Sequence, residues 1–146
     1  MLSSGHNTRM SVRTAQCQCG QLKAHCSGEA ARISMCHCLA CQRRTGAPFA
    51  ANSRFARSAV RAQGDSRTWV READTGNEVC QHFCPQCGTT VFWELSGFPE
   101  VIAVSSSLFS DPAYPSPTVS VWEQYKHAWT DRIADLDLER WSKMPD

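Results

Sequence analysis

The sequence predicts a mainly β, single-domain protein, and three observations support this class. Short runs rich in β-branched and aromatic residues recur along the chain, turn residues separate them, and only one segment near the C-terminus has a helical pattern. No repeat or Pro/Gly linker divides the 146 residues, a length that suits one domain with its own core. We therefore expect a small sandwich or curved sheet over residues 13–146, preceded by a loosely ordered tail, residues 1–12.

The expected elements follow one another at short intervals. Strands are predicted over residues 21–26, 31–36, 48–55, 68–73, 77–83, 89–95, 100–109 and 118–125. Gly, Pro, Asn, Asp and Ser mark turns at residues 27–29, 63–66, 74–77, 95–100 and 110–117. The stretch DRIADLDLERW, residues 131–141, is the expected short C-terminal helix.

The N-terminal stretch MLSSGHNTRMSVRTAQ is polar and has no apolar core of a secretory signal. We therefore expect a cytoplasmic protein. In that reducing compartment clustered cysteines more often bind metal than form disulfides, and the odd total of nine also argues against complete pairing. No apolar run approaches the length of a membrane-spanning helix, so no membrane partner is expected.

Seven cysteines form three groups, in the stretches CQCG, CHCLAC and CPQCG. The last is typical of a zinc knuckle, in which Pro85 stiffens the turn and Gly88 permits a positive φ. Two thiolates are half of a tetrahedral site, and the first group supplies the other pair. The sequence therefore predicts a closed structural Zn²⁺ site that clamps distant parts of the chain. Its ligands are Cys17, Cys19, Cys84 and Cys87.

The middle group predicts a second, open site. Cys36 and Cys38 share a strand face and Cys41 returns one turn later, whereas alternation points His37 to the opposite face. Three protein ligands with a free fourth position are typical of catalytic zinc. Because three thiolates polarise water poorly, this ligand set suits the capture of a soft ligand such as a thiol.

Other donors remain as long-range candidates, with packing or ordinary hydrogen bonding as the simpler interpretation of each. These are Cys26, Cys80, His25 and His82, and the same simple interpretation applies to His127. An iron–sulfur cluster is the weaker alternative to zinc, because it usually needs four cysteines.

The formal charge is only +1, but basic residues are concentrated in residues 43–71, with one acid among them. These are Arg43, Arg44, Arg54, Arg57, Arg61, Arg67 and Arg71. They are either a solvated sheet face or an electropositive rim for an anionic small molecule or nucleic acid. Seven thiolates and two Zn²⁺ would change the formal charge to −2, so nucleic acid is an unlikely partner.

The order CxCG, then CHCxxC followed by RRTGAPF, then FCPxCG followed by TTVFWE, resembles the glutathione-dependent formaldehyde-activating enzyme family, which includes centromere protein V. The resemblance runs from about Cys17 to Trp129 and includes SSSLFSDP. It implies a fold of two curved antiparallel sheets in a tent-like arrangement. It also implies two Zn²⁺ per chain, one structural and one catalytic or exchangeable, on the seven cysteines already named.

The resemblance further implies a carbon–sulfur lyase that joins formaldehyde to glutathione to give S-hydroxymethylglutathione. Cys36, Cys38 and Cys41 would then be the catalytic ligands, and a small thiol such as glutathione and an aldehyde the partners. Arg43, Arg44 or Arg54 are candidates for pairing with glutathione carboxylates. The aromatic candidates for a pocket wall are Phe49, Phe92, Trp93 and Trp122, for which core packing is the simpler interpretation.

Two further functions compete with this one. The chain could be a non-enzymatic zinc-binding module that contacts nucleic acid or protein through residues 43–71. It could also be a redox sensor or zinc buffer, because an unsaturated thiolate site is readily oxidised.

Overall fold

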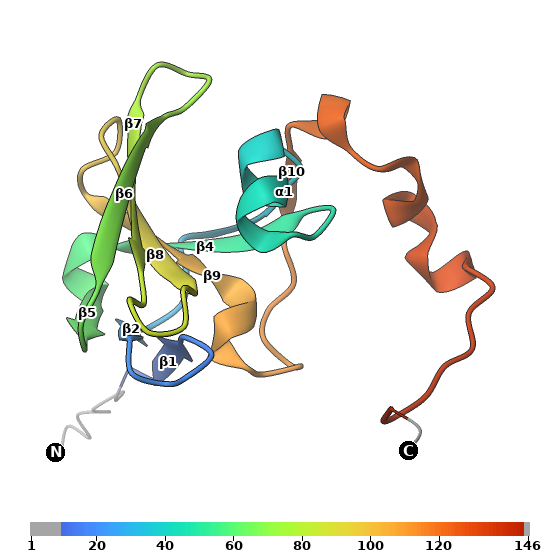
Figure 1. Ribbon diagram of the computed structural model, residues 1–146, viewed down its shortest axis with the longest axis horizontal. Helices are drawn as coiled ribbons and strands as arrows, with labels where there is room; N and C mark the ends of the chain where they lie inside the picture. The colour runs from blue at the N-terminus through green and yellow to red at the C-terminus, as the bar shows by residue number, and fades with distance from the viewer. Residues whose placement is uncertain (1–9, 145–146) are drawn as a thin grey trace, which may run out of the picture.

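A computed structural model describes residues 10–144 and confirms the mainly β class (Figure 1). Among these residues the strands form two sheets. The three-stranded sheet has the order β1-β2-β5, and the seven-stranded sheet has the order β10-β3-β4-β9-β8-β7-β6. All neighbours pair antiparallel except β10 and β3, which pair in parallel at one edge.

The strands are β1 (Val12–Gln16), β2 (Lys23–Ser27), β3 (Arg32–Cys36), β4 (Ala50–Ala56), β5 (Val60–Gln63), β6 (Arg67–Glu72), β7 (Glu78–Phe83), β8 (Thr90–Leu95), β9 (Val101–Ser105) and β10 (Val119–Val121). The α-helix among the described residues is α1 (Leu39–Thr45), and the 3₁₀ helices are η1 (Arg57–Ala59), η2 (Ser106–Phe109), η3 (Glu123–Tyr125) and η4 (Ala128–Asp135).

Eight of these strands coincide with the runs predicted from sequence, whereas β1 and β5 are additional. Most of the predicted tail lies outside the described residues, and its last residue, Val12, begins β1. Both additional strands are short and carry arginine, so their apolar pattern is weak, yet they flank β2 and complete the smaller sheet.

The core lies where the small sheet covers β4, β8 and β9 of the large one. Its fully buried side chains include Leu22, Cys26, Phe55, Val91 and Val104. Phe55 of β4 meets Phe109 of η2 edge-to-face, with ring centroids 6.1 Å apart. The run predicted to be one strand over 100–109 therefore divides: β9 ends at Ser105, and η2 turns Phe109 into the core.

The C-terminal segment leaves the sheets after β10, which ends at Val121 because Trp122 adopts a left-handed backbone with φ of 58°. Figure 1 shows the remaining segment running away from the sheets. The helical part of this segment is η4, which is irregular at Arg132 and ends at Asp135, so the predicted helix over 131–141 begins earlier and is shorter. Asp135 is the last residue of η4 and Asp137 follows it, and acidic residues at a helix C-terminus oppose the helix dipole.

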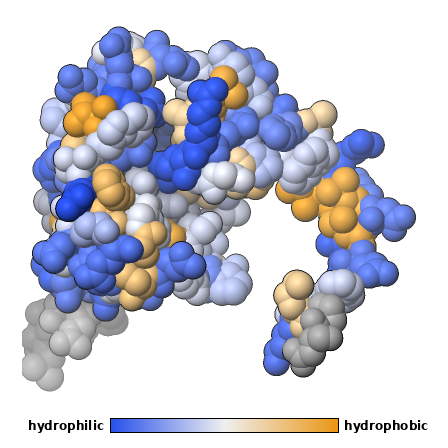
Figure 2. All heavy atoms as spheres, viewed as in Figure 1, coloured by the Kyte–Doolittle hydropathy of each residue, from blue (hydrophilic) through white to orange (hydrophobic). Residues whose placement is uncertain are grey.

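No side chain of η4 is buried, and apolar residues of this segment such as Ile133 and Leu138 remain exposed (Figure 2). Where the segment passes α1, Gln42 connects the two: its Nε2 donates to the Tyr125 carbonyl at 3.0 Å, and its Oε1 lies 3.0 Å from His127 Nε2. The described residues contain no helix long and apolar enough to span a membrane.

Candidate functional site

Two tight turns bring the first and last cysteine groups together. Cys17 follows β1, Cys84 follows β7, and the Cys17 and Cys84 amides donate across their own turns to the Leu22 and Thr89 carbonyls, each at 2.9 Å. Gly20 and Gly88 adopt φ of 83° and 78°, which residues with a Cβ rarely accept. The Gln18 amide donates to Thr89 Oγ1 at 3.1 Å, so the two turns also contact each other directly.

The four sulfur atoms of this cluster have the spacing of a tetrahedral thiolate site. All lie within 4.8 Å of one another, with Cys17–Cys19 at 3.6 Å and Cys19–Cys84 at 3.7 Å. Four thiolates at the usual zinc–sulfur distance of about 2.3 Å lie about 3.8 Å apart. The Leu22 amide and Gln21 Nε2 donate to Cys17 Sγ and Cys84 Sγ, each at 3.2 Å. The donor set and its outer hydrogen bonds therefore fit a closed metal site.

The middle group of cysteines also gathers, at the junction of β3 and α1. Cys36 ends β3, Cys38 is the N-cap of α1, and Cys41 lies in its first turn. Cys38 Sγ accepts from the Cys41 amide at 3.3 Å, as a serine hydroxyl does at an ordinary N-cap. The three sulfurs lie within 4.8 Å of one another, and each side chain is at most 9% exposed. These three donors could hold a metal ion that keeps a fourth position free.

His37 does not belong to this cluster, as its alternation with Cys36 and Cys38 predicted. Its ring is fully buried on the other side, where Nε2 lies 3.1 Å from Ser120 Oγ. Phe49 packs against this ring, with centroids 5.8 Å apart.

Two polar side chains, a guanidinium and an amide, lie close to the Cys41 sulfur. Arg44 Nη2 and Asn52 Nδ2 lie 4.0 Å and 3.7 Å from Cys41 Sγ, and Arg44 Nη2 also donates to Asn52 Oδ1 at 3.1 Å. The Arg44 guanidinium stacks on Trp93, 4.2 Å from the ring centroid. Hydrogen bonds from the Cys36 and Cys38 thiols, and then the charge of Arg44, lower the pKa of Cys41. The cluster therefore favours thiolate at this sulfur.

A cavity of about 350 Å³ opens onto the three cysteines. Trp93, Phe98 and Trp122 contribute aromatic walls. Its charged lining residues within the described chain are all basic: Arg32, Arg54 and Arg71. None of these three forms an ion pair with a carboxylate of residues 10–144.

Arg32 and Arg54 are directly opposite each other in the pairing of β3 with β4. Like charges in that position repel each other. Burial, and then the charge of Arg32, lower the pKa of Arg54. An uncompensated pair of guanidinium groups in a cavity is a receptor for an anion.

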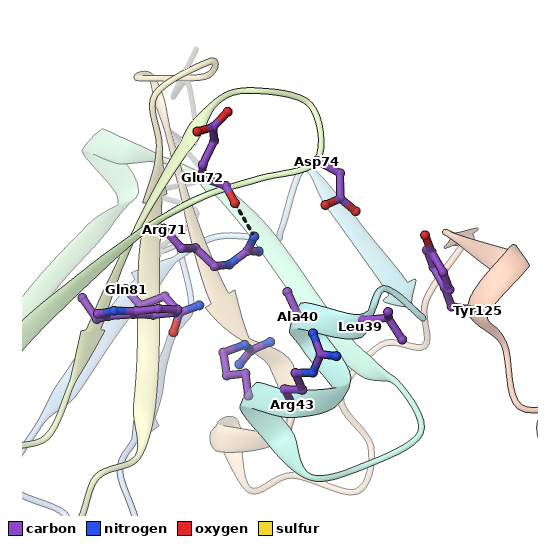
Figure 3. A pocket seen from close by; sticks show the side chains of 10 residues that line it. Leu39, Ala40, Arg43, Arg71, Glu72, Asp74, Gln81 and Tyr125 are labelled. Atoms are coloured by element: carbon purple, nitrogen blue, oxygen red, sulfur yellow. Dashed lines mark hydrogen bonds between the residues drawn. The ribbon is translucent and has the colours of Figure 1, made fainter.

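A second cavity, of about 460 Å³, lies between α1 and the β6–β7 region (Figures 2 and 3). Arg43 of α1 and Arg71 of β6 extend into it from opposite walls, and Glu72 and Asp74 line it too (Figure 3). Arg71 lines both cavities, and its buried Nε has no hydrogen-bond partner among the described residues.

The other cysteine and histidine candidates pack or form hydrogen bonds as the simpler interpretation predicted, except for Cys80. Cys26 is fully buried in the core, and His25 is satisfied by Thr14 Oγ1 and Gln63 Oε1, each at 2.8 Å. The prediction that Cys80 packs in the core is wrong, because this residue is only half-buried and lies beside His82.

Of the aromatic candidates, Trp93 and Trp122 line the cysteine cavity. Phe92 faces the other side of the sheet, where it stacks on His82 with centroids 4.4 Å apart.

The arginine-rich region divides among several places instead of forming one exposed stripe. Arg44, Arg54 and Arg71 line the two cavities, and Arg57 pairs with Glu94 at 2.7 Å.

Sequence reasoning missed Arg32 and Asn52. The sequence does contain a signal for Arg32, because Arg32, Ser34 and Cys36 are two residues apart and therefore lie on one face of β3. The pairing of Ser34 with Asn52, which brings β4 into the site, is long-range and has no signal in the sequence.

Comparison with known proteins gives one family. A model of the glutathione-dependent formaldehyde-activating enzyme family matches residues 12–125. No curated protein was found to match the chain. Among solved structures, a crystal structure of a Rhodobacter sphaeroides protein is similar, with 20% sequence identity and a TM-score of 0.54. The match covers 73% of this chain and 98% of that one, and it shows that the two share a fold.

Proposed function

The chain belongs to the glutathione-dependent formaldehyde-activating enzyme family, and from this membership we propose that it is a zinc-dependent carbon–sulfur lyase. It would form or cleave a thiol–aldehyde adduct of the S-hydroxymethylglutathione type. The observation that carries the proposal is the open cluster of three cysteines at the base of a cavity whose charged lining is entirely basic.

Cys17, Cys19, Cys84 and Cys87 would hold the structural Zn²⁺. Their four sulfurs join the turn after β1 to the turn after β7, segments 65 residues apart at Cys19 and Cys84. A bound ion here stabilises the packing of the small sheet on the large one, because the unfolded chain has no preformed site.

Cys36, Cys38 and Cys41 would hold the second Zn²⁺. When bound, this ion lowers the pKa of an incoming thiol and holds it as the thiolate. The chain's own contribution is the orientation of the three sulfurs: the Cys41 amide fixes Cys38, and Asn52 and Arg44 contact Cys41. Outer contacts of this kind set ligand geometry and affinity.

The cavity arginines would bind the carboxylates of the thiol substrate. Glutathione carries two carboxylates, and guanidinium groups pair with carboxylates through two parallel hydrogen bonds. Arg32 and Arg54 are opposite each other in the pairing of β3 with β4, and Arg71 lines the same cavity. The same groups supply positive charge where negative charge develops on the aldehyde oxygen.

In the forward direction the thiol sulfur attacks the carbonyl carbon of formaldehyde. The thiol loses its proton, a carbon–sulfur bond forms, the carbonyl electron pair moves to oxygen, and that oxygen takes up a proton to give the hemithioacetal. Cleavage reverses these steps. Binding both reactants in one cavity converts a bimolecular encounter into a local one, and this proximity is the main source of acceleration.

The test is the exchange rate between free glutathione and its formaldehyde adduct, measured by NMR at equilibrium and corrected for the uncatalysed rate. We expect the wild-type chain to accelerate exchange and Cys38→Ser to abolish the acceleration while the fold persists. Cys26→Ser is the matched control, because Cys26 is a buried cysteine outside the clusters. Equal acceleration by Cys38→Ser and wild type would refute the proposal.

The redox-sensor alternative makes a different prediction. If the three cysteines act as a sensor, mild oxidant should release about one Zn²⁺ reversibly, and the exchange rate with glutathione should equal the uncatalysed rate.

A further inference from the structure

A third cluster of potential metal ligands lies on the face of the large sheet opposite Trp93. Cys80 and His82 are two residues apart on β7 and therefore point to the same side. In the pairing of β7 with β8, Cys80 is opposite Glu94 and His82 is opposite Phe92. The three side chains thus meet on one face without any loop to position them.

The sulfur, nitrogen and oxygen donor atoms of the three residues lie within 4.8 Å of one another. His82 Nε2 lies 2.8 Å from Glu94 Oε2 and 3.9 Å from Cys80 Sγ. A nucleophile–base–acid triad needs the thiol and the carboxylate on different ring nitrogens. Here both face the same nitrogen, so the arrangement does not fit a triad. A metal ion, in contrast, needs one donor atom from each residue around a common centre.

We propose that Cys80, His82 and Glu94 form a third Zn²⁺ site, with three protein ligands and a fourth position for water or a small anion. The inference is independent of the proposed lyase function. Sulfur, nitrogen and oxygen are all zinc donors, and a thiolate, a neutral imidazole and a carboxylate balance the ion's charge.

The spacing is close to what zinc requires. Around a tetrahedral ion, sulfur and nitrogen ligands lie about 3.6 Å apart, and nitrogen and oxygen ligands about 3.4 Å apart. The observed 3.9 Å and 2.8 Å differ from these by about 0.3 Å and about 0.6 Å, so the Glu94 carboxylate would move away from the imidazole when the ion binds. The Glu94 side chain is 33% exposed and has room to shift.

Neighbouring groups orient the ligands. His82 stacks on Phe92 at an interplanar angle of 13°, which fixes its ring. Arg57 Nη1 donates to Glu94 Oε1 at 2.7 Å and leaves Oε2 directed at the histidine. Such outer contacts are typical of ligands that are held for a metal.

A cavity of about 300 Å³ lies beside the cluster, and Arg57, His82 and Glu94 line it. It supplies space for an exchangeable fourth ligand, and Arg57 favours an anionic one. Because its ligands are half-exposed and include one sulfur only, this site should release zinc more readily than the two thiolate clusters.

The experiment starts from the full chain, from which a weak chelator has removed loosely held metal. This chain is then titrated with Zn²⁺ and, separately, with Co²⁺. We expect one additional equivalent to bind to the wild type, with a cobalt spectrum of mixed sulfur, nitrogen and oxygen ligation. Cys80→Ser, His82→Gln and Glu94→Gln should each weaken that equivalent at least tenfold and leave the more tightly held metal unchanged. Cys26→Ser should bind it as the wild type does.

A second measurement, NMR of the histidine side chains in the wild type, tests the proposal even if a variant fails to fold. We expect added Zn²⁺ to shift the His82 Nε2 resonance and to leave that of His25 in place. The proposal is overturned if the wild type takes up no additional equivalent, if the three variants bind like the wild type, or if His82 Nε2 does not respond. In that case the cluster is a hydrogen-bonded group without metal.

Discussion

Arg44→Met tests how the second cysteine cluster is supported. The substitution keeps most of the aliphatic part of the side chain and removes the guanidinium. The hydrogen bond to Asn52 Oδ1 at 3.1 Å and the stacking on Trp93 at 4.2 Å are then lost, and so is the weaker contact of Nη2 with Cys41 Sγ at 4.0 Å. Asn52 is only 8% exposed, so water cannot easily replace the lost donor.

The expected loss of stability is worked out from the hydrogen bond and the stacking contact. A hydrogen bond from a charged donor contributes about 1.5–3 kcal/mol, and leaving a buried acceptor unpaired accounts for much of that cost. A cation–π contact contributes about 0.5–2 kcal/mol, depending on its exposure. Because methionine retains part of the contact with Trp93, we expect the free energy of unfolding to fall by about 2–4 kcal/mol.

The assay is urea unfolding at a fixed concentration of free Zn²⁺, because bound metal changes the apparent stability. The matched control is Arg43→Met, which changes the exposed neighbour on the same short helix and should alter stability by less than about 0.5 kcal/mol. Equal small effects of the two substitutions would refute the assignment of Arg44 as a support of the site.

Three further predictions concern the cavity arginines, the closed cysteine cluster and the core. Arg32→Gln and Arg54→Gln should each raise KM for glutathione about tenfold or more and leave the rate with an uncharged thiol unchanged, which steady-state exchange measurements with both thiols will show. The Thr89 hydroxyl, 3.3 Å from Cys87 Sγ, is the main cause that lowers the pKa of Cys87 to about 5. Thr89→Val should raise this pKa, so the thiolate protonates earlier as pH falls, and a chromogenic chelator should detect zinc release at a higher pH than in wild type. Tyr114→Phe should reduce the free energy of unfolding by about 1 kcal/mol in urea titrations, because the phenol lies 2.7 Å from the buried Ser53 Oγ.

Local patterns in the sequence predicted much of the fold and both cysteine clusters. Runs of β-type residues between turn residues marked eight of the strands, and the spacing within each cysteine group indicated that its members share one site. His37 is an instructive case, because strand alternation alone placed it away from Cys36 and Cys38.

Long-range pairing explains what the sequence did not reveal. Arg32 enters the cavity because β3 pairs with β4 in one register, and a shift of one residue would turn Asn52 and Arg54 to the opposite face. Glu94 joins Cys80 and His82 only through the register of β7 and β8. Such registers depend on the packing of the whole sheet and have no counterpart in a single motif.

NMR of the cadmium-substituted chain would show whether a thiol binds at Cys36, Cys38 and Cys41, because the cadmium shift depends strongly on the number of bound sulfurs. We expect one resonance for the closed site of Cys17, Cys19, Cys84 and Cys87 and another for Cys36, Cys38 and Cys41. Cadmium bound at Cys80, His82 and Glu94, which offer one sulfur only, would give a separate resonance far from both. On addition of glutathione, only the second should move, toward the position typical of four sulfurs, and it should be absent in Cys38→Ser. A second resonance that ignores glutathione, or no second resonance at all, would contradict thiol binding at the three cysteines.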